Sequence, residues 1–143
     1  MRQAYPVIFR PDANETVIAE VPDVPGAATV GKDRGEAMER VQDALLVMLS
    51  GLMEDRRPIP QPSRQRKGQA TVVVPPMAAA KLSIYQAMRE AKVSQLQLAA
   101  RLGCDARQVR RLLDLDHRSR FDQLDAALRA LGKELVVDVR DAA

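Results

Sequence analysis

The sequence predicts an α+β protein, in which a small antiparallel sheet with one helix is followed by an all-α helix-turn-helix domain and a final strand. Three observations support this fold class. Short β-prone segments surround a turn near the start of the chain. Apolar residues then recur at helical spacing to about residue 55, and residues 93–113 have the pattern of two short helices joined at Gly103. We place the two domains at residues 1–75 and 76–143.

The first strands are expected at residues 5–10 and 16–21, which the turn-forming segment Pro-Asp-Ala-Asn separates. This pattern predicts a β-hairpin. Residues 27–30 can add a third strand, and the apolar residues 70–74, which precede two prolines, are expected to complete the same sheet as a fourth strand. The proline-rich and basic residues 58–69 are expected to form an exposed connection.

The helix of the first domain is expected to begin at Asp33. An aspartate can accept a hydrogen bond from the backbone of the first helical turn, and Glu36, three residues later, is the usual partner of such a cap. Packing this helix on one face of the sheet would bury its apolar stripe. The stripe comprises Ala37, Val41, Ala44, Leu45, Met48 and Leu52.

The second domain is expected to begin with a helix at residues 77–91. Ser94 and Asp105 are then good N-cap residues, and each is followed three positions later by a glutamine. Gly103 lies between them, where the first of two short helices must end and the chain must turn sharply. This layout is that of a helix-turn-helix, whose second helix lies in the major groove of DNA. The stretch resembles the Cro and repressor-like domains.

Outward-facing residues of this helix-turn-helix carry the predicted DNA contacts. Arginine can bond bidentately to guanine, glutamine to adenine, and further arginines can hold phosphates. The alternative interpretation is a solvated basic helix in a small bundle. The residues predicted to contact DNA are Ser94, Gln95, Ala106, Arg107, Gln108, Arg110 and Arg111, with Arg118 and Arg120 in the loop that follows.

The end of the chain predicts one more helix and a strand. Ser119 is expected to cap the helix, Leu124, Leu128 and Leu131 to face inward, and Gly132 to end it. Residues 134–139 (ELVVDV) then predict a hydrophobic strand with no partner in its own domain. We therefore expect it to pair with another copy, so that the protein forms a homodimer or a higher homo-oligomer.

Composition and charge limit the functions that the chain can have. Only 3% of the 143 residues are aromatic, which argues against base stacking as a mode of binding. Residues 1–55 carry 5 basic and 10 acidic side chains, net −5, whereas residues 56–143 carry 17 and 9, net +8. The two parts are therefore expected to meet different partners.

Few residues suit a metal site or a membrane segment. The single cysteine, Cys104, excludes an internal disulfide and is expected to lie in the core; together with the single histidine, His117, it leaves no Cys/His zinc site. No apolar run approaches the roughly 18 residues of a membrane-spanning helix, and the start is too short and polar for a signal peptide. We expect a cytoplasmic protein without a cofactor.

Several short motifs in the first domain are specific when taken together. They are the turn Pro-Asp-Val-Pro-Gly at residues 22–26, Thr29 and Gly31 before a helix with Glu36-Ala37, and Ile-Pro-Gln-Pro-Ser at residues 59–63. This combination resembles the N-terminal domain of the HicB family, antitoxins of bacterial type II toxin-antitoxin pairs. The resemblance covers residues 5–63, and a helix-turn-helix C-terminal domain is one of that family's arrangements.

The resemblance implies a partial RNase H-like fold that binds and blocks a small, basic, RNA-cleaving toxin of the HicA family, without enzymatic activity of its own. Combined with the helix-turn-helix, it implies an antitoxin that represses its own operon by binding a palindromic operator. The acidic residues near the strands are the expected toxin contacts, although they could equally form a solubilising surface. They are Asp12, Glu15, Glu20 and Asp23.

Two other functions remain open from the sequence. The first is a stand-alone repressor whose N-terminal domain dimerises or senses a ligand. The second is a metal-dependent nuclease, which would need several of these carboxylates to converge on one divalent cation.

Overall fold

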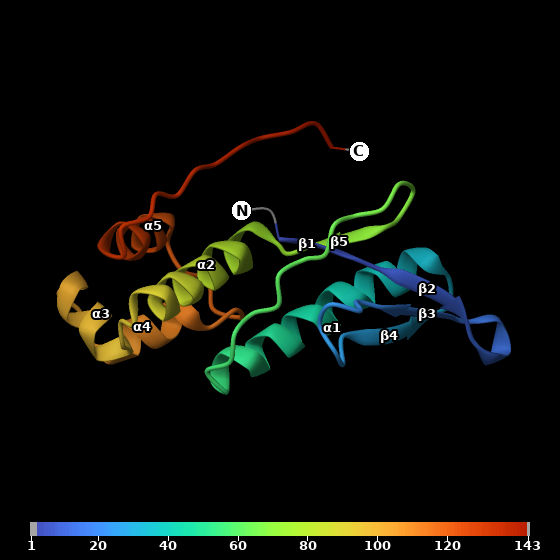
Figure 1. Cartoon of the computed structure of the whole chain (residues 1–143), viewed down its shortest axis with the longest axis horizontal. Coiled ribbons are helices and arrows are strands. Elements are labelled where there is room, and N and C mark those ends of the chain that lie inside the picture. Colours follow the sequence, from blue (N-terminus) through green and yellow to red (C-terminus); the bar gives the residue numbers. More distant parts are fainter. Residues whose placement is uncertain (1–2, 143) are drawn as a thin grey trace. The chain divides into compact units, whose positions relative to one another are not determined.

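A computed structural model describes residues 3–142 and divides the chain into two compact units. The first ends at Pro76 and the second begins at Met77. Figure 1 shows a unit of strands and one long helix followed along the chain by a unit of helices. The expected boundary was after residue 75; that the two units are domains with separate functions stays a prediction.

The strands of the first unit form two separate antiparallel sheets. Strands β2 (Ile8–Pro11), β3 (Val17–Glu20) and β4 (Ala28–Gly31) form a three-stranded sheet in that order. Strands β1 (Ala4–Pro6) and β5 (Thr71–Val73) pair only with each other. The expected hairpin between the second and third strands is confirmed, and a short 3-10 helix, η1 (Ala13–Glu15), connects them.

Two details of the expected sheet are wrong. The strand expected at residues 5–10 is divided at Val7, and residues 70–74 do not extend the three-stranded sheet. Pro6 has no N–H with which to continue a ladder. The N–H of Val7 donates to the carbonyl oxygen of Ala70 (2.9 Å), and the chain then changes partner, so that Ile8 pairs with β3.

Helix α1 (Arg34–Glu54) covers one face of the three-stranded sheet. Its predicted start is confirmed, because Oδ1 of Asp33 accepts a hydrogen bond from the backbone N–H of Glu36 at 2.8 Å. The buried stripe runs along one face of the helix and includes Leu49 and Met53, which were not expected. Of the residues that were expected, Ala44, Met48 and Leu52 are only half-buried. The stripe consists of Ala37, Val41, Leu45, Leu49 and Met53.

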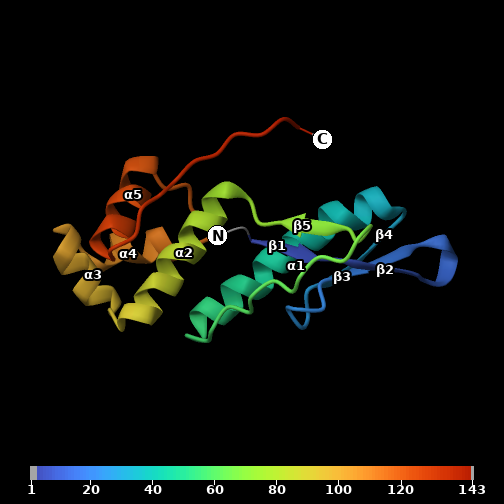
Figure 2. The same cartoon turned by 45° about the horizontal axis from the view of Figure 1, so that its top comes forward.

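The second unit consists of four helices around one apolar core. They are α2 (Pro76–Ala91), α3 (Gln95–Leu102), α4 (Ala106–Leu113) and α5 (Phe121–Ala130), as Figure 2 shows from a second angle. All four helices contribute to the core, and the three leucines Leu124, Leu128 and Leu131 face it as expected. None of the helices in the described part of the chain is both long and apolar enough to cross a bilayer.

The chain's last segment differs from the prediction. Residues 134–139 form no strand in the described single chain, because no neighbouring segment offers backbone hydrogen bonds to them. Leu135 packs partly against the helical core. Val136, Val137 and Val139 are 76%, 65% and 88% exposed, which leaves an apolar surface uncovered.

Candidate functional site

Helices α3 and α4, which the sequence predicts to form a helix-turn-helix, have the expected caps and turn. Oγ of Ser94 accepts a hydrogen bond from the backbone N–H of Gln97 (3.1 Å), and Oε1 of Gln97 accepts one from the N–H of Ser94 (2.9 Å). Gly103 ends α3 at φ +66°, a left-handed conformation that favours glycine. Oδ1 of Asp105 then accepts from the backbone N–H of Gln108 (2.9 Å) and starts α4.

The two short helices are held by a buried apolar face. Leu98 and Ala99 of α3 and Val109 and Leu112 of α4 are buried in the core of the second unit. Leu102, Cys104 and Leu113, which were also expected to face inward, pack against that core but remain partly exposed. This packing fixes which face of α4 is left for solvent.

The solvent face of α4 is strongly basic. Arg107, Gln108, Arg110 and Arg111 are exposed and Ala106 is half-buried. Among residues 3–142, no hydrogen bond or ion pair restrains the guanidinium groups of these three arginines. They stand on a short, capped helix with no acidic residue in its first turn. We call Arg107, Gln108, Arg110 and Arg111 the basic face of α4.

The remaining predicted DNA contacts lie on either side of α4 in the sequence. Ser94 is exposed and Gln95 half-buried at the start of α3, where the Ser94 hydroxyl is engaged in capping. Arg118 is exposed in the loop after α4, and Nη2 of Arg120 lies 3.2 Å from a carboxylate oxygen of Asp122. That pair is highly exposed, so it would cost little to exchange it for a phosphate contact.

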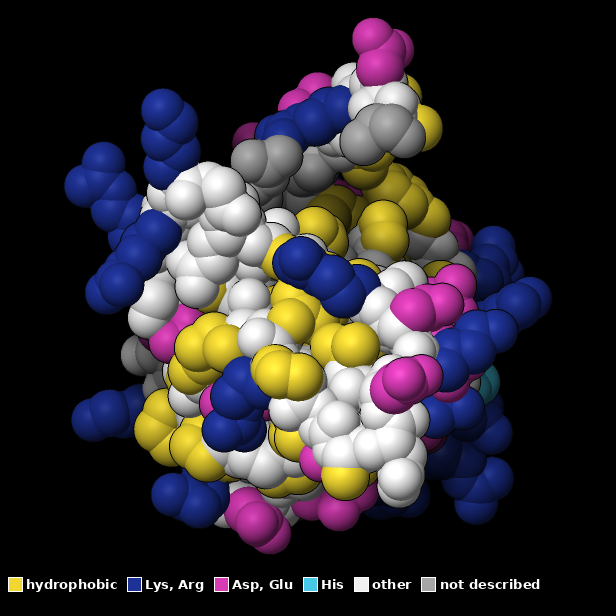
Figure 3. Space-filling model, turned by 90° about the vertical axis from the view of Figure 1, so that its right-hand side faces the viewer, with side chains coloured by type: hydrophobic (Ala, Val, Ile, Leu, Met, Phe, Trp, Pro, Cys, Tyr) yellow, Lys and Arg dark blue, Asp and Glu magenta, His cyan; other side chains and the backbone are white. Residues whose placement is uncertain are grey.

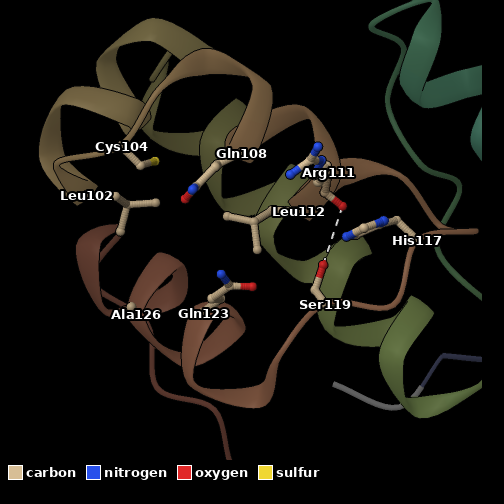
Figure 4. A pocket seen from close by; sticks show the side chains of 9 residues that line it. All are labelled: Leu102, Cys104, Gln108, Arg111, Leu112, His117, Ser119, Gln123 and Ala126. Atoms are coloured by element: carbon tan, nitrogen blue, oxygen red, sulfur yellow. Dashed lines mark hydrogen bonds between the residues drawn. The ribbon is translucent and has the colours of Figure 1, made fainter.

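A cavity of about 190 Å³ lies beside the basic face of α4, between α4, α5 and the loop that joins these two helices. Figure 4 shows the side chains of Gln108 and Gln123 directed toward its centre, with Leu112 between them. The lining also includes apolar groups and the partly buried Cys104. The full lining comprises Leu102, Cys104, Gln108, Arg111, Leu112, His117, Ser119, Gln123 and Ala126.

A buried lysine behind α4 was not predicted from the sequence. Lys81 of α2 is fully buried, and its Nζ donates to the backbone oxygen of Arg111 (2.6 Å) and to Oγ of Ser119 (2.7 Å). Burial lowers the pKa of Lys81, and the negative charge of Asp114 opposes that shift. Ser119 is thus buried and engaged with Lys81, so its expected role as the cap of α5 is wrong; that position belongs to Arg120.

The four acidic residues predicted to contact a toxin do not form one cluster. Asp12 and Glu15 are exposed at the β2–β3 connection. Glu20, at the far end of β3, forms an ion pair with Arg10 (3.2 Å), and Asp23 lies in the turn that follows. No group of three possible metal-binding side chains occurs in the part of the chain that the structure describes.

Charge in the first unit is mixed rather than acidic. The basic residues between positions 56 and 67 belong to the same unit as the acidic residues before them. Residues 1–76 therefore carry 10 basic and 10 acidic side chains. On the face shown in Figure 3, acidic side chains (magenta) lie at several separate places with basic side chains (dark blue) between them.

The motifs singled out in the first domain are physically joined. The carboxylate of Asp23 accepts hydrogen bonds from the N–H (2.7 Å) and the hydroxyl (2.5 Å) of Ser63. Oη of Tyr5 donates to the carbonyl oxygen of Pro60 (2.8 Å), and its burial, with a smaller effect from Asp23, raises the pKa of Tyr5 to about 12. These contacts hold the Ile-Pro-Gln-Pro-Ser segment against the turn that contains Asp23.

Gly31 completes this set of motifs. Any Cβ at this position would overlap the backbone nitrogen of Ala37 in α1. The sheet and the helix therefore approach each other through a backbone contact that requires glycine. The residues that define the motif thus maintain the packing of the unit, and Asp23 in particular has partners within it.

Comparisons with known proteins agree on one family. Residues 4–83 match the family model described as HicB_like antitoxin of bacterial toxin-antitoxin system. The chain is 40% identical over 131 residues to antitoxin HicB 2 of Photorhabdus laumondii, covering 92% of each chain. It is 34% identical over 131 residues to antitoxin HicB of Escherichia coli K12, covering 92% of this chain and 95% of that one. The chain is also similar to the crystal structure of the N-terminal domain of Burkholderia pseudomallei antitoxin HicB, with 17% identity and a TM-score of 0.41 over 50% of this chain and 95% of that one.

Proposed function

This chain belongs to the HicB family of antitoxins of bacterial toxin-antitoxin systems, and from that premise we propose that its first unit neutralises a small, RNA-cleaving toxin of the HicA type. An antitoxin of this family is not an enzyme, so neutralisation requires only binding. The first unit would cover the surface that the toxin presents to RNA. Such a surface must be basic to hold phosphates, so carboxylates are the natural complement to it.

The carboxylates best placed for this role are Asp12 and Glu15. Both are exposed at the β2–β3 connection, where Asp12 accepts one long hydrogen bond from the hydroxyl of Thr16 (3.4 Å). Glu20 is instead paired with Arg10, and Asp23 holds Ser63. Charge complementarity of this kind speeds association more than it strengthens the complex. We expect Asp12→Asn combined with Glu15→Gln to slow association with the toxin and to weaken its dependence on salt, as measured by surface plasmon resonance. Glu90→Gln combined with Asp116→Asn, which also removes two exposed acids but from the other unit, is the matched control.

We further propose that the second unit binds the operator of the chain's own operon. The observation that supports this function is the basic face of α4, whose arginines have no partner among the described residues and stand on a short helix fixed by two capped turns. In a helix-turn-helix this helix enters the major groove. An electrophoretic mobility shift with the promoter fragment tests the function; equal affinity for promoter and random DNA would contradict it.

Dimerisation would allow the protein to bind a palindromic operator. The exposed valines of residues 134–139 offer a β-prone edge that another copy can pair with, which would give a homodimer or a higher homo-oligomer. The two copies would then bind two half-sites about one turn of the DNA helix apart. Sedimentation of the Val137→Asp variant measures this role directly. A variant that stays at the wild-type mass would exclude these residues as the interface.

The other two functions considered from the sequence lose support. Family membership favours a toxin partner over a stand-alone repressor. The acids of the first unit are divided between the β2–β3 connection, an ion pair and a turn, which is not the convergent arrangement that a metal-dependent nuclease needs.

A further inference from the structure

The buried lysine behind α4 makes no predicted contact with DNA or toxin itself. Lys81 is fully buried, and its ammonium group donates to the carbonyl oxygen of Arg111 at 2.6 Å and to the hydroxyl of Ser119 at 2.7 Å. Lysine is almost never fully buried unless it is paired. Because both partners lie far along the chain, in α4 and in the loop that follows α4, the ammonium joins segments that the sequence separates by 30 and 38 residues.

The first partner belongs to the last turn of α4. Carbonyl groups there have no partner within the helix, and the helix dipole makes this end negative. The backbone N–H of Asp114 reaches the same carbonyl oxygen only at 3.3 Å. The ammonium of Lys81 therefore makes a shorter hydrogen bond to this carbonyl oxygen than the backbone does, at the C-terminal end of the helix that carries the basic face.

The second partner fixes the loop after α4. Ser119 is 7% exposed, and its hydroxyl lies 3.4 Å from the carbonyl oxygen of Arg111, as the dashed line in Figure 4 shows. Arg118 and Arg120, the two predicted phosphate contacts, flank Ser119 directly in the sequence. Anchoring Ser119 thus fixes the backbone from which both arginines extend.

We propose that Lys81 is a positioning residue for DNA recognition, which ties the end of α4 and the loop at residues 114–120 to α2 and so holds the base-contacting and phosphate-contacting arginines in one geometry. This inference rests on the DNA-binding function proposed above. A binding site held by its supporting residues loses specificity when those residues are removed, even if every contacting side chain is still present.

Replacing Lys81 by methionine distinguishes a role in positioning from a role in stability. Lys81→Met keeps the length and the apolar stem but removes all donors, and it also removes the cost of burying a charge. The carbonyl oxygen of Arg111 keeps the N–H of Asp114 (3.3 Å) and the hydroxyl of Ser119 (3.4 Å) as donors. The carbonyl oxygen of Arg111 and the hydroxyl of Ser119 would both lose their ammonium partner. The variant should therefore fold and yet hold α4 and its loop less firmly.

The test compares the full-length Lys81→Met variant with Lys133→Met. Lys133 is exposed and pairs with Glu90 at 3.3 Å, so it controls for the loss of one positive charge. We expect Lys81→Met to bind the promoter fragment about tenfold more weakly, with a much smaller change on random DNA. Amide hydrogen exchange should accelerate at residues 111–119, and Lys133→Met should show neither effect.

A folded Lys81→Met protein with the wild-type ratio of promoter to random affinity and unchanged exchange at residues 111–119 would overturn the proposal. If the wild-type chain itself does not distinguish the promoter from random DNA, the proposed repressor function fails, and the exchange measurement still decides whether Lys81 holds α4. If Lys81→Met does not fold, Ser119→Ala takes its place, since it keeps the ammonium and removes one of its two anchors; we expect a smaller loss in the same direction.

Discussion

Replacing Arg107 by alanine separates base recognition from general attraction to DNA. The side chain is exposed and unpaired within the described residues, so its loss should change the free energy of unfolding by less than about 0.5 kcal/mol. A bidentate arginine-guanine contact contributes about 1–3 kcal/mol of discrimination, which is roughly a 5- to 150-fold change in affinity for each half-site. A dimer on a palindrome should lose that amount twice.

The matched variant is Arg118→Ala, in the loop after α4. Arg118 is also exposed and unpaired among the described residues, but it is predicted to contact phosphate. Fluorescence anisotropy titrations with promoter and random duplexes at several salt concentrations distinguish the two roles. Arg107→Ala should weaken promoter binding selectively, whereas Arg118→Ala should weaken both and reduce the salt slope by about 1 for each copy. Equal losses on both duplexes for Arg107→Ala would refute its assignment to base contact.

Three further predictions concern the packing of each unit. Gly31→Ala should destabilise the first unit by about 1–3 kcal/mol, because its Cβ meets the backbone of α1, whereas Gly51→Ala, in open space within α1, should stabilise it by up to about 1 kcal/mol in thermal melts. Leu98→Ala should cost the second unit about 2–5 kcal/mol in urea unfolding, and Leu96→Ala, 73% exposed on the same helix, less than about 0.5 kcal/mol. Since folding raises the pKa of Tyr5 from 10.0 to about 12, the folded chain holds that proton more tightly, so this contribution to stability is complete below pH 10 and falls as pH rises toward 12. Tyr5→Phe should remove that part of the alkaline destabilisation; an unchanged pH profile would show that Tyr5 does not cause it.

Local signals made helices α3 and α4 and the turn between them predictable. The two helix caps and the glycine turn involve only neighbouring backbone groups. The structure has Ser94, Gly103 and Asp105 in these expected roles. Asp33 likewise caps α1. These predictions succeeded because a helix cap and a glycine turn depend on the nearest backbone groups, which the sequence specifies directly.

Features that depend on distant partners could not be predicted in the same way. Ser119 has the residue type of a helix cap, but its hydroxyl binds Lys81, 38 residues earlier. Lys81 lies on α2, and its burial depends on two acceptors far along the chain, the carbonyl oxygen of Arg111 and the hydroxyl of Ser119. The change of strand partner at Val7 also depends on a remote residue, Ala70.

Co-expression with the small protein encoded directly upstream of this chain's gene tests the central claim most directly. We expect the upstream protein to be basic and to stop growth when it is expressed alone. It should co-purify with the chain in a complex that restores growth. A stable chain that neither binds that protein nor relieves its toxicity would contradict the proposed neutralisation, and a neighbour without toxicity would contradict the identity of the partner.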